Sequence, residues 1–145
     1  MQVRHILREK GREIIALKSD ATLQDAAILL AQKRIGALIV RGSHGDLAGI
    51  FSERDLVRAI AERGAAALSD TLARFMTEAV ATCTETDSVD NLMEMMTHGR
   101  FRHLPVTDGD GALCGVVSIG DVVKTRIDET VGEAQSLRDY IAAAV

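Results

Sequence analysis

The chain has 145 residues, of which 17 are basic and 21 acidic, so its formal charge at pH 7 is −4. Hydrophobic residues make up 47% of it, enough to fill the core of a compact domain, which excludes disordered, collagenous and disulfide-scaffold proteins. Aromatic residues make up only 3%, and the sequence contains no block of Lys and Arg. We therefore expect no nucleic-acid partner, because such a partner needs a basic face or an aromatic stacking platform.

The sequence predicts neither export nor membrane insertion. Charged residues interrupt the apolar residues of segment 1–13, where a signal peptide would be continuously apolar. The longest apolar stretches, such as 26–31 and 37–40, are far shorter than the roughly 20 residues of a spanning helix. Cys83 and Cys114 are distant in sequence and form no C-x-x-C motif. We expect a soluble, cytoplasmic protein with reduced thiols, no metal site and no membrane contact.

Apolar spacing and turn formers predict a β-α-β-β-α order in the first half of the chain. Thr22 and Asp25 form a capping pair at the start of the first helix, and Gly64 ends the second. The expected strands are 14–17, 37–40 and 47–51, and the expected helices are 22–34 and 52–63.

The same order is expected in the second half, at about 80–84, 88–99, 103–107, 113–117 and 119–128. A further amphipathic helix is expected to begin at Thr130, with Leu137, Tyr140 and Ile141 on one side. The predicted division is a first repeat (1–64), a connecting segment (65–79), a second repeat (80–128) and a C-terminal helix (129–145).

An internal repeat supports this division. Residues 49–55, GIFSERD, align with residues 115–121, GVVSIGD, at an offset of 115 − 49 = 66. At the same offset ALIV (37–40) aligns with HLPV (103–106). Two helical sets with i, i+3, i+4, i+7 spacing also align, and each predicts a buried helix face: Leu23, Ala26, Ala27 and Leu30 with Val89, Leu92, Met93 and Met96.

The duplicated order, with Leu-Pro-Val before a glycine turn and Gly-x-x-Ser-x-x-Asp closing each unit, resembles a tandem pair of cystathionine-β-synthase (CBS) domains over nearly the whole chain. The resemblance implies an α/β (α+β) fold of two units packed sheet to sheet with pseudo-twofold symmetry. It also implies two clefts that bind adenosine-containing ligands, and a flat homodimer. Most such modules regulate an attached or partner protein and catalyse no reaction.

The repeated Ser-x-x-Asp motif has a chemistry of its own. Each Ser stands where a strand meets a helix, and a helix N-terminus favours a bound phosphate. The Asp three residues later only accepts hydrogen bonds, so it suits the two hydroxyls of a ribose. The alternative is that Ser-x-x-Asp is an ordinary capping box that needs no ligand.

Two sets of candidate site residues follow from the motif and the resemblance. Arg102 and His103 replace Gly36 and Ala37 of the first unit and add phosphate donors to the second cleft. Ala16 stands where the second unit has the hydroxyl of Thr82. Lys10, Lys33 and Arg100 are expected to face solvent. The predicted second cleft contains Val80, Thr82, Arg102, His103, Ser118, Ile119 and Asp121, and the first contains Ile14, Ala16, Gly36, Ala37, Ser52, Arg54 and Asp55.

The predicted function is a sensor module that binds an adenine nucleotide and signals to an unidentified protein. AMP is the preferred ligand, with ATP, NAD or S-adenosylmethionine as the other possibilities. No catalytic cofactor is expected, because the sequence contains no nucleophile elbow, no H-E-x-x-H motif and no P-loop. Two alternatives stay open: a constitutive dimerisation or scaffold subunit with empty clefts, and an enzyme with His103 as its base.

Overall fold

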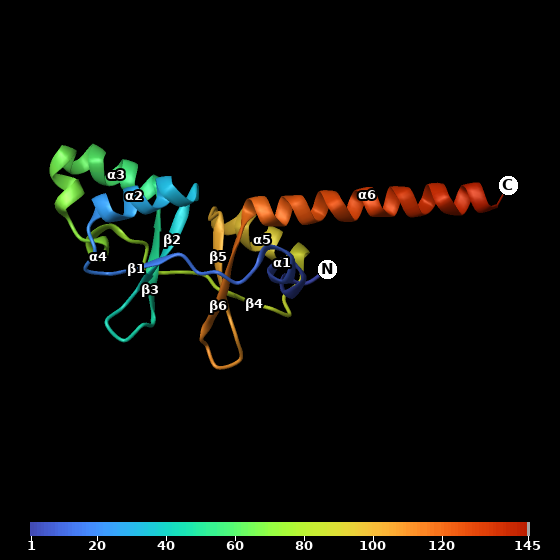
Figure 1. Ribbon diagram of the computed structural model, residues 1–145, viewed down its shortest axis with the longest axis horizontal. Helices are drawn as coiled ribbons and strands as arrows, with labels where there is room; N and C mark the ends of the chain where they lie inside the picture. The colour runs from blue at the N-terminus through green and yellow to red at the C-terminus, as the bar shows by residue number, and fades with distance from the viewer. Residues whose placement is uncertain (145) are drawn as a thin grey trace.

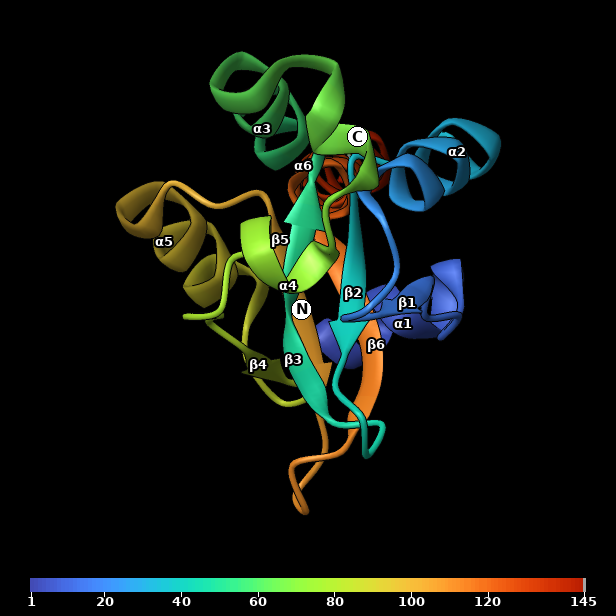
Figure 2. The ribbon, with the colours of Figure 1, turned by 90° about the vertical axis from the view of Figure 1, so that its left-hand side faces the viewer.

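The computed structural model describes residues 1–144, so the last residue of the predicted tail lies outside the described residues. It contains two three-stranded sheets, β1-β2-β3 and β4-β5-β6, with β2 and β3 next to β5 and β6 in both views (Figure 1 and Figure 2). The first half contains α1 (Val3–Lys10), β1 (Ala16–Lys18), α2 (Leu23–Lys33), β2 (Ala37–Arg41), β3 (Leu47–Ser52) and α3 (Glu53–Arg63). The second contains β4 (Cys83–Thr84), α5 (Val89–Gly99), β5 (His103–Thr107), β6 (Leu113–Ser118) and α6 (Ile119–Ala143). A 3-10 helix, η1 (Gly64–Ser69), and the short α4 (Leu72–Phe75) connect them.

The two halves repeat one another in detail, which confirms the predicted duplication and the α/β class. In each sheet the first strand pairs parallel with the second, and the second pairs antiparallel with the third. The antiparallel register shifts between Val40 and Arg41 in one sheet and between Val106 and Thr107 in the other. These irregularities lie 66 residues apart, so the duplication extends to backbone defects.

The predicted capping signals also hold. Thr22, Ser52 and Ser118 each begin a helix with a capping box that an Asp three residues later completes. At their C-terminal ends α2 and α5 stop at Arg34 and Arg100, with left-handed φ angles of 54° and 56°. Glycine is the usual residue for this conformation, so both repeats carry an arginine at an unfavourable backbone position.

Each repeat has its own hydrophobic core. Of the predicted buried face of α2, Leu23, Ala26 and Leu30 are buried, whereas Ala27 is half-buried. On α5 the corresponding residues Val89, Leu92 and Met96 are buried, but Met93 is 37% exposed. The prediction that Met93 belongs to the core is therefore wrong, because the buried stripe of α5 is narrower than the i, i+4 spacing suggests and position 93 lies at its edge.

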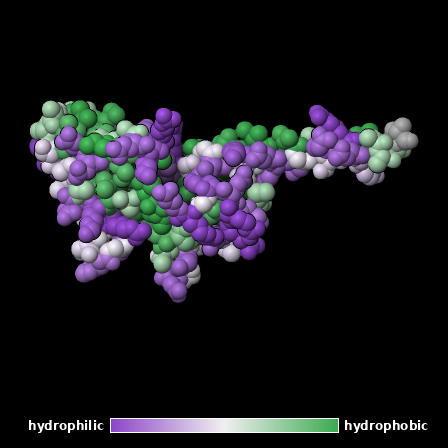
Figure 3. All heavy atoms as spheres, in the orientation of Figure 1, coloured by the Kyte–Doolittle hydropathy of each residue, from purple (hydrophilic) through white to green (hydrophobic). Residues whose placement is uncertain are grey.

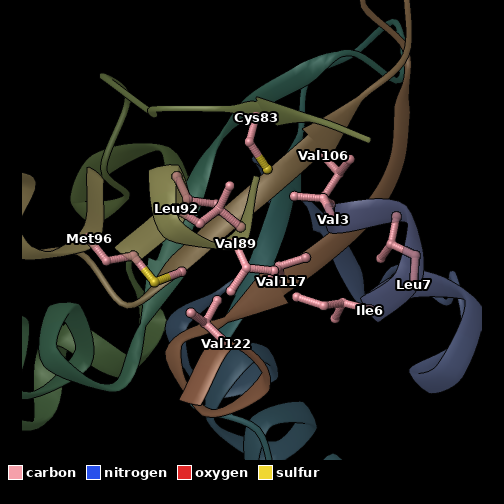
Figure 4. Packing of buried hydrophobic residues seen from close by; sticks show 11 residues of the cluster. Val3, Ile6, Leu7, Cys83, Val89, Leu92, Met96, Val106, Val117 and Val122 are labelled. Atoms are coloured by element: carbon pink, nitrogen blue, oxygen red, sulfur yellow. The ribbon is translucent and has the colours of Figure 1, made fainter. Parts of the chain in front are cut away.

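The short helix before each repeat packs on the other repeat. Helix α1 was not predicted, and its Val3, Ile6 and Leu7 belong to the core of the second repeat (Figure 4). A Cβ on Gly115 of β6 would lie 2.7 Å from Leu7, so the absence of a side chain there admits the helix. Helix α4 packs into the first repeat in the same way. Residues 3–10, within the predicted first repeat 1–64, therefore take their packing partners from β4 onwards.

The C-terminal helix α6 is continuous, whereas two helices were predicted with a break near residue 129. Gly132 is the residue near the expected break that most disfavours a helix, and a single glycine lowers helix stability without ending the helix. The second half of α6 projects away from the sheets (Figure 1). Among the described residues, no helix combines the length and apolar character needed to span a membrane.

Candidate functional site

A cavity of about 420 Å³ lies between the two repeats. This volume is within the range of about 300–1,000 Å³ that is usual for small-molecule sites. We call it the Asp121 cavity. The first repeat contributes Glu13, Ile15, Arg34, Gly36, Ala37 and Ile39 to its lining, among others, and the second contributes His103, Val116, Ser118 and Asp121.

Asp121 lies at the first turn of α6 with one carboxylate oxygen occupied and the other free. Its Oδ2 accepts hydrogen bonds from the Ser118 backbone N–H at 2.9 Å and from the Ser118 hydroxyl at 3.0 Å. Within residues 1–144 no protein donor reaches its Oδ1. The motif is thus a capping box that also leaves one carboxylate oxygen without a protein donor, so the two interpretations of Ser-x-x-Asp are compatible.

Lys10 at the end of α1 provides the counter-charge. Its Nζ donates to Oδ2 of Asp121 at 2.7 Å and to the carbonyl oxygen of Val116 at 2.9 Å. Partial burial by itself raises the pKa of Asp121, but hydrogen bonds from Lys10 and Ser118 and the charge of Lys10 outweigh it and lower the pKa. Lys10 is exposed, as predicted, but its ion pair with Asp121 was not predicted. The i, i+3, i+4 spacing of Val3, Ile6 and Leu7 is the signal that could have placed it on a helix.

His103 faces the cavity from the start of β5. Its ring lies beside Gly36 of the first repeat, where a Cβ would be 3.5 Å from Cε1 of His103, an ordinary contact distance. Burial lowers the pKa of His103, and the positive charge of Lys10 lowers it further. At neutral pH the ring is therefore an uncharged donor and acceptor rather than a fixed cation.

The pseudo-equivalent position in the first repeat is closed. Oδ1 of Asp55 accepts a hydrogen bond from Arg58 at 2.8 Å, and the Thr77 hydroxyl lies 3.5 Å away. The backbone of Thr77 also pairs with Ile50 of β3 through two hydrogen bonds of 2.8 and 3.0 Å. Asp55 is only 4% exposed. Both oxygens of this carboxylate have protein partners, and we call this place the Asp55 site.

The residues predicted for two clefts are distributed differently in the structure. Gly36 and Ala37 were assigned to the first cleft, yet they line the Asp121 cavity together with His103, Ser118 and Asp121 of the predicted second cleft. The prediction built each cleft from one repeat. The cavity instead lies between strands of one repeat and the α6 N-terminus of the other.

Several predicted residues lie outside the lining of this cavity. Arg102 is exposed and borders an outer groove along α6 with Ile119, which is 41% exposed. Thr82 and Arg54 are exposed, and Val80 is half-buried just before β4. Ile14 and Ala16 are half-buried on either side of Ile15, the residue that lines the cavity, and Ser52 caps α3 beside Asp55.

Comparison with known proteins identifies the family. The CBS domain sequence model matches residues 3–62 and 72–134. A mitochondrial CBS domain-containing protein of Arabidopsis thaliana is 36% identical over 144 residues, covering 94% of this chain and 69% of its own. The crystal structure of a CBS-domain containing protein from Agrobacterium tumefaciens is 45% identical, with a TM-score of 0.83 over 86% of this chain and 92% of that one.

Two similar structures contain ligands. A CBS domain protein from Pyrobaculum aerophilum, complexed with AMP, is 28% identical with a TM-score of 0.75, covering 83% of this chain and 89% of that one. A CBS domain pair complexed with 5′-methylthioadenosine and S-adenosylmethionine is 26% identical with a TM-score of 0.79, covering 89% and 98%. With the two matched segments and the duplicated fold, these comparisons establish that the chain belongs to the CBS domain family and carries two copies of the domain.

Proposed function

We propose that the protein is a cytoplasmic, non-catalytic sensor that binds one adenine nucleotide, AMP first among them, in the Asp121 cavity. The observation that carries this proposal is the free Oδ1 of Asp121 in a cavity of ligand size. The AMP and S-adenosylmethionine complexes of similar CBS proteins support adenosine as the common part of the ligand.

The polar end of the cavity suits a ribose phosphate. Oδ1 of Asp121 can accept a hydrogen bond from a ribose hydroxyl. The N-terminus of α6 and the ammonium of Lys10 both favour negative charge nearby. A phosphate within reach of Lys10 would share its donors with Asp121 and keep the charges of the site balanced.

The apolar end suits the base. Ile15, Ile39 and Val116 line the cavity with aliphatic side chains from both repeats. A purine between them buries its faces, while strand backbone groups at the cavity edge can read its polar edge. We therefore expect adenine to be preferred to guanine, whose 6-position presents an acceptor in place of a donor.

Signalling follows from the position of the cavity between the repeats. A ligand that contacts β1 and β2 on one side and α6 on the other ties the two repeats together. It shifts a conformational equilibrium only by its difference in affinity for the two states, so a partner protein must recognise that difference. One surface of this kind is the face of α3 that carries Val57 and Ile60, which are 66% and 42% exposed. These exposed apolar side chains support the expected homodimer.

Isothermal titration of the purified chain with AMP, ATP, NAD, S-adenosylmethionine and GMP tests the proposal. We expect adenine nucleotides to bind at one site per chain and AMP to bind more tightly than GMP. At a hundredfold excess over Kd the ligand should stabilise the fold by about 2.7 kcal/mol, which a thermal melt detects. Absence of binding by all five compounds would contradict the proposal and favour a constitutive scaffold, and equal affinity for AMP and GMP would refute the adenine assignment.

A further inference from the structure

The second half of α6 has no partner within the chain. From Thr130 to Ala143 every residue is exposed, and the last side chain of α6 with contacts to the domain is Glu129, 3.5 Å from the N-terminal amine. A helix of about this length is marginal in water when nothing covers it, and Gly132 weakens it further. A continuous helix that projects this far therefore indicates a surface that packs against something (Figure 1).

A heptad seam runs along this helix. Alternating steps of four and three residues connect a set of mostly apolar side chains, which define the seam: Val123, Ile127, Thr130, Ala134, Leu137, Ile141 and Ala144. Its large members Val123, Ile127, Leu137 and Ile141 are 46%, 56%, 60% and 55% exposed. Figure 3 shows hydrophobic atoms along the upper edge of the part of the helix nearer the domains. An average step of 3.5 residues is the signature of a coiled coil rather than of packing against a flat sheet.

We propose that the seam pairs with the same seam of a second copy of the chain to form a parallel, two-stranded coiled coil. Ile127 and Ile141 then occupy a positions and Leu137 a d position, the combination that favours parallel dimers. Glu133 at g and Arg138 at e are five residues apart, so in a parallel pair each Glu133 lies opposite the second copy's Arg138. An antiparallel pair would bring like positions together and lose this ion pair.

The charge of the tail favours a second copy over a membrane surface. Beyond residue 127 its acidic residues are Asp128, Glu129, Glu133 and Asp139, and its one basic residue is Arg138. Interfacial helices that bind anionic lipid carry Lys and Arg on the polar face instead. The CBS domain match ends at residue 134, so this pairing would extend beyond the domain pair and is separate from contacts between the domains themselves.

Cysteine cross-linking tests both the pairing and its direction. In a parallel, in-register coiled coil, residue 134 of one chain lies opposite residue 134 of the second chain, and the same holds for residue 141. The variants Ala134→Cys and Ile141→Cys should therefore each give a disulfide-linked dimer under mild oxidation. The two positions are about 10 Å apart along the helix, so an antiparallel pair could link at one of them at most. Asp139→Cys, on the outer face of the helix, is the matched control and should stay monomeric on a non-reducing gel.

The native cysteines leave this readout clear. Burial, with the charge of Asp87, raises the pKa of the Cys83 thiol to about 12, and burial also raises the pKa of Cys114. In the Ala134→Cys chain, adding Leu137→Asp should abolish the cross-link, while adding Gln135→Asp on the outer face should preserve it. A cooperative thermal unfolding transition in each variant would show that the domains remain folded. A cross-link at neither seam position, or at one alone, overturns the proposal.

Discussion

Asp55 and Asp121 occupy the same place in two copies of one structural unit, yet their carboxylates have different hydrogen-bond partners. Both accept hydrogen bonds from the capping serine three residues earlier. The second oxygen of Asp55 accepts hydrogen bonds from Arg58 and Thr77, whereas no donor within residues 1–144 reaches the second oxygen of Asp121, a residue that lines the cavity. The helix cap is thus the same in both repeats. The two sites differ in the segment that follows the short helix, α4 at the Asp55 site and α1 at the Asp121 cavity.

The difference arises at two aligned pairs of residues. After α4 the chain continues through Met76 and Thr77, and Thr77 pairs with the backbone of β3. After α1 the chain continues through Lys10 and Gly11, and only the Lys10 side chain reaches the corresponding carbonyl on β6. Gly11 has a φ of 100°, which turns the backbone away from the sheet. Backbone pairing by Thr77 closes the Asp55 site, whereas at the Asp121 cavity only the Lys10 side chain contacts the corresponding position.

The largest expected effect comes from removing each carboxylate in turn. Asp121→Ala should weaken AMP binding tenfold or more, because it removes the acceptor for the ribose, a loss of about 1–3 kcal/mol. Asp55→Ala should leave AMP affinity nearly unchanged and lower the melting temperature, because Arg58 loses its buried partner. Titration and thermal melts of both variants measure this, with Asp121→Asn as the isosteric control. Loss of AMP binding in Asp55→Ala alone would reverse the assignment of the two sites.

A second test makes the open site resemble the closed one. Lys10→Met introduces the residue found at the aligned position 76 and removes the cation beside Asp121. We expect AMP affinity to fall roughly fivefold, about 1 kcal/mol, since a charge-assisted hydrogen bond is lost at a partly exposed position. S-adenosylmethionine, which carries a positive sulfonium, should lose less affinity or gain some. Competition titration of the two ligands measures the ratio of the AMP affinity to the S-adenosylmethionine affinity. Lys10→Arg keeps the positive charge and should preserve this ratio. An unchanged ratio in Lys10→Met would remove Lys10 from ligand selection.

Arg34 and Arg100, the two arginines with left-handed backbone conformation, occupy equivalent positions in the two repeats, so each serves as a control for the other. Arg34→Gly and Arg100→Gly should each stabilise the fold by up to about 1 kcal/mol, because glycine adopts this conformation without strain. Only Arg34 lines the Asp121 cavity, so only Arg34→Gly should also reduce AMP affinity. Urea denaturation and titration of both variants separate the two effects. Equal loss of AMP affinity in both would show that the arginines act through the fold instead.

The smallest effect expected is a pH dependence from His103. Its pKa is lowered in the fold by burial and by the charge of Lys10, so the unfolded chain binds more protons below pH 6.5. Its contribution to the free energy of unfolding is therefore constant above about pH 7 and decreases as the pH falls through 6.5. Urea denaturation between pH 7.5 and 5 measures the free energy of unfolding at each pH. This free energy should fall less steeply with decreasing pH in His103→Asn than in the parent chain. Identical slopes would place His103 in solvent.

The repeat was predictable because each of its signals is local. The capping pairs Thr22 with Asp25 and Ser118 with Asp121 act within four residues, and the periodicity of each helix lies within one element. The leading helices were not predicted as part of the opposite core, because only tertiary packing brings Leu7 against Gly115. The continuity of α6 was missed for a different reason. Gly132 disfavours a helix, but a single glycine lowers helix stability without ending the helix.

The site was predicted in part for the same reason. Ser118 and Asp121 carry a motif, and His103 and Gly36 were found by comparing the two repeats. Their assembly into one cavity depends on how the repeats face each other, and no local pattern encodes that arrangement. Lys10 belongs to no motif, and its role is defined only by the fold that carries it to Asp121.

The exchange of leading helices also constrains how the chain can reach its native state. Helix α1 is synthesised first, but its partners Val106 and Val117 follow about a hundred residues later. While the first repeat emerges from the ribosome, the apolar face of α1 has no native surface to cover it. Contacts of such large sequence separation slow folding. Helix α1 therefore has to wait for the last strand, and the second repeat completes its core only with a helix from the start of the chain.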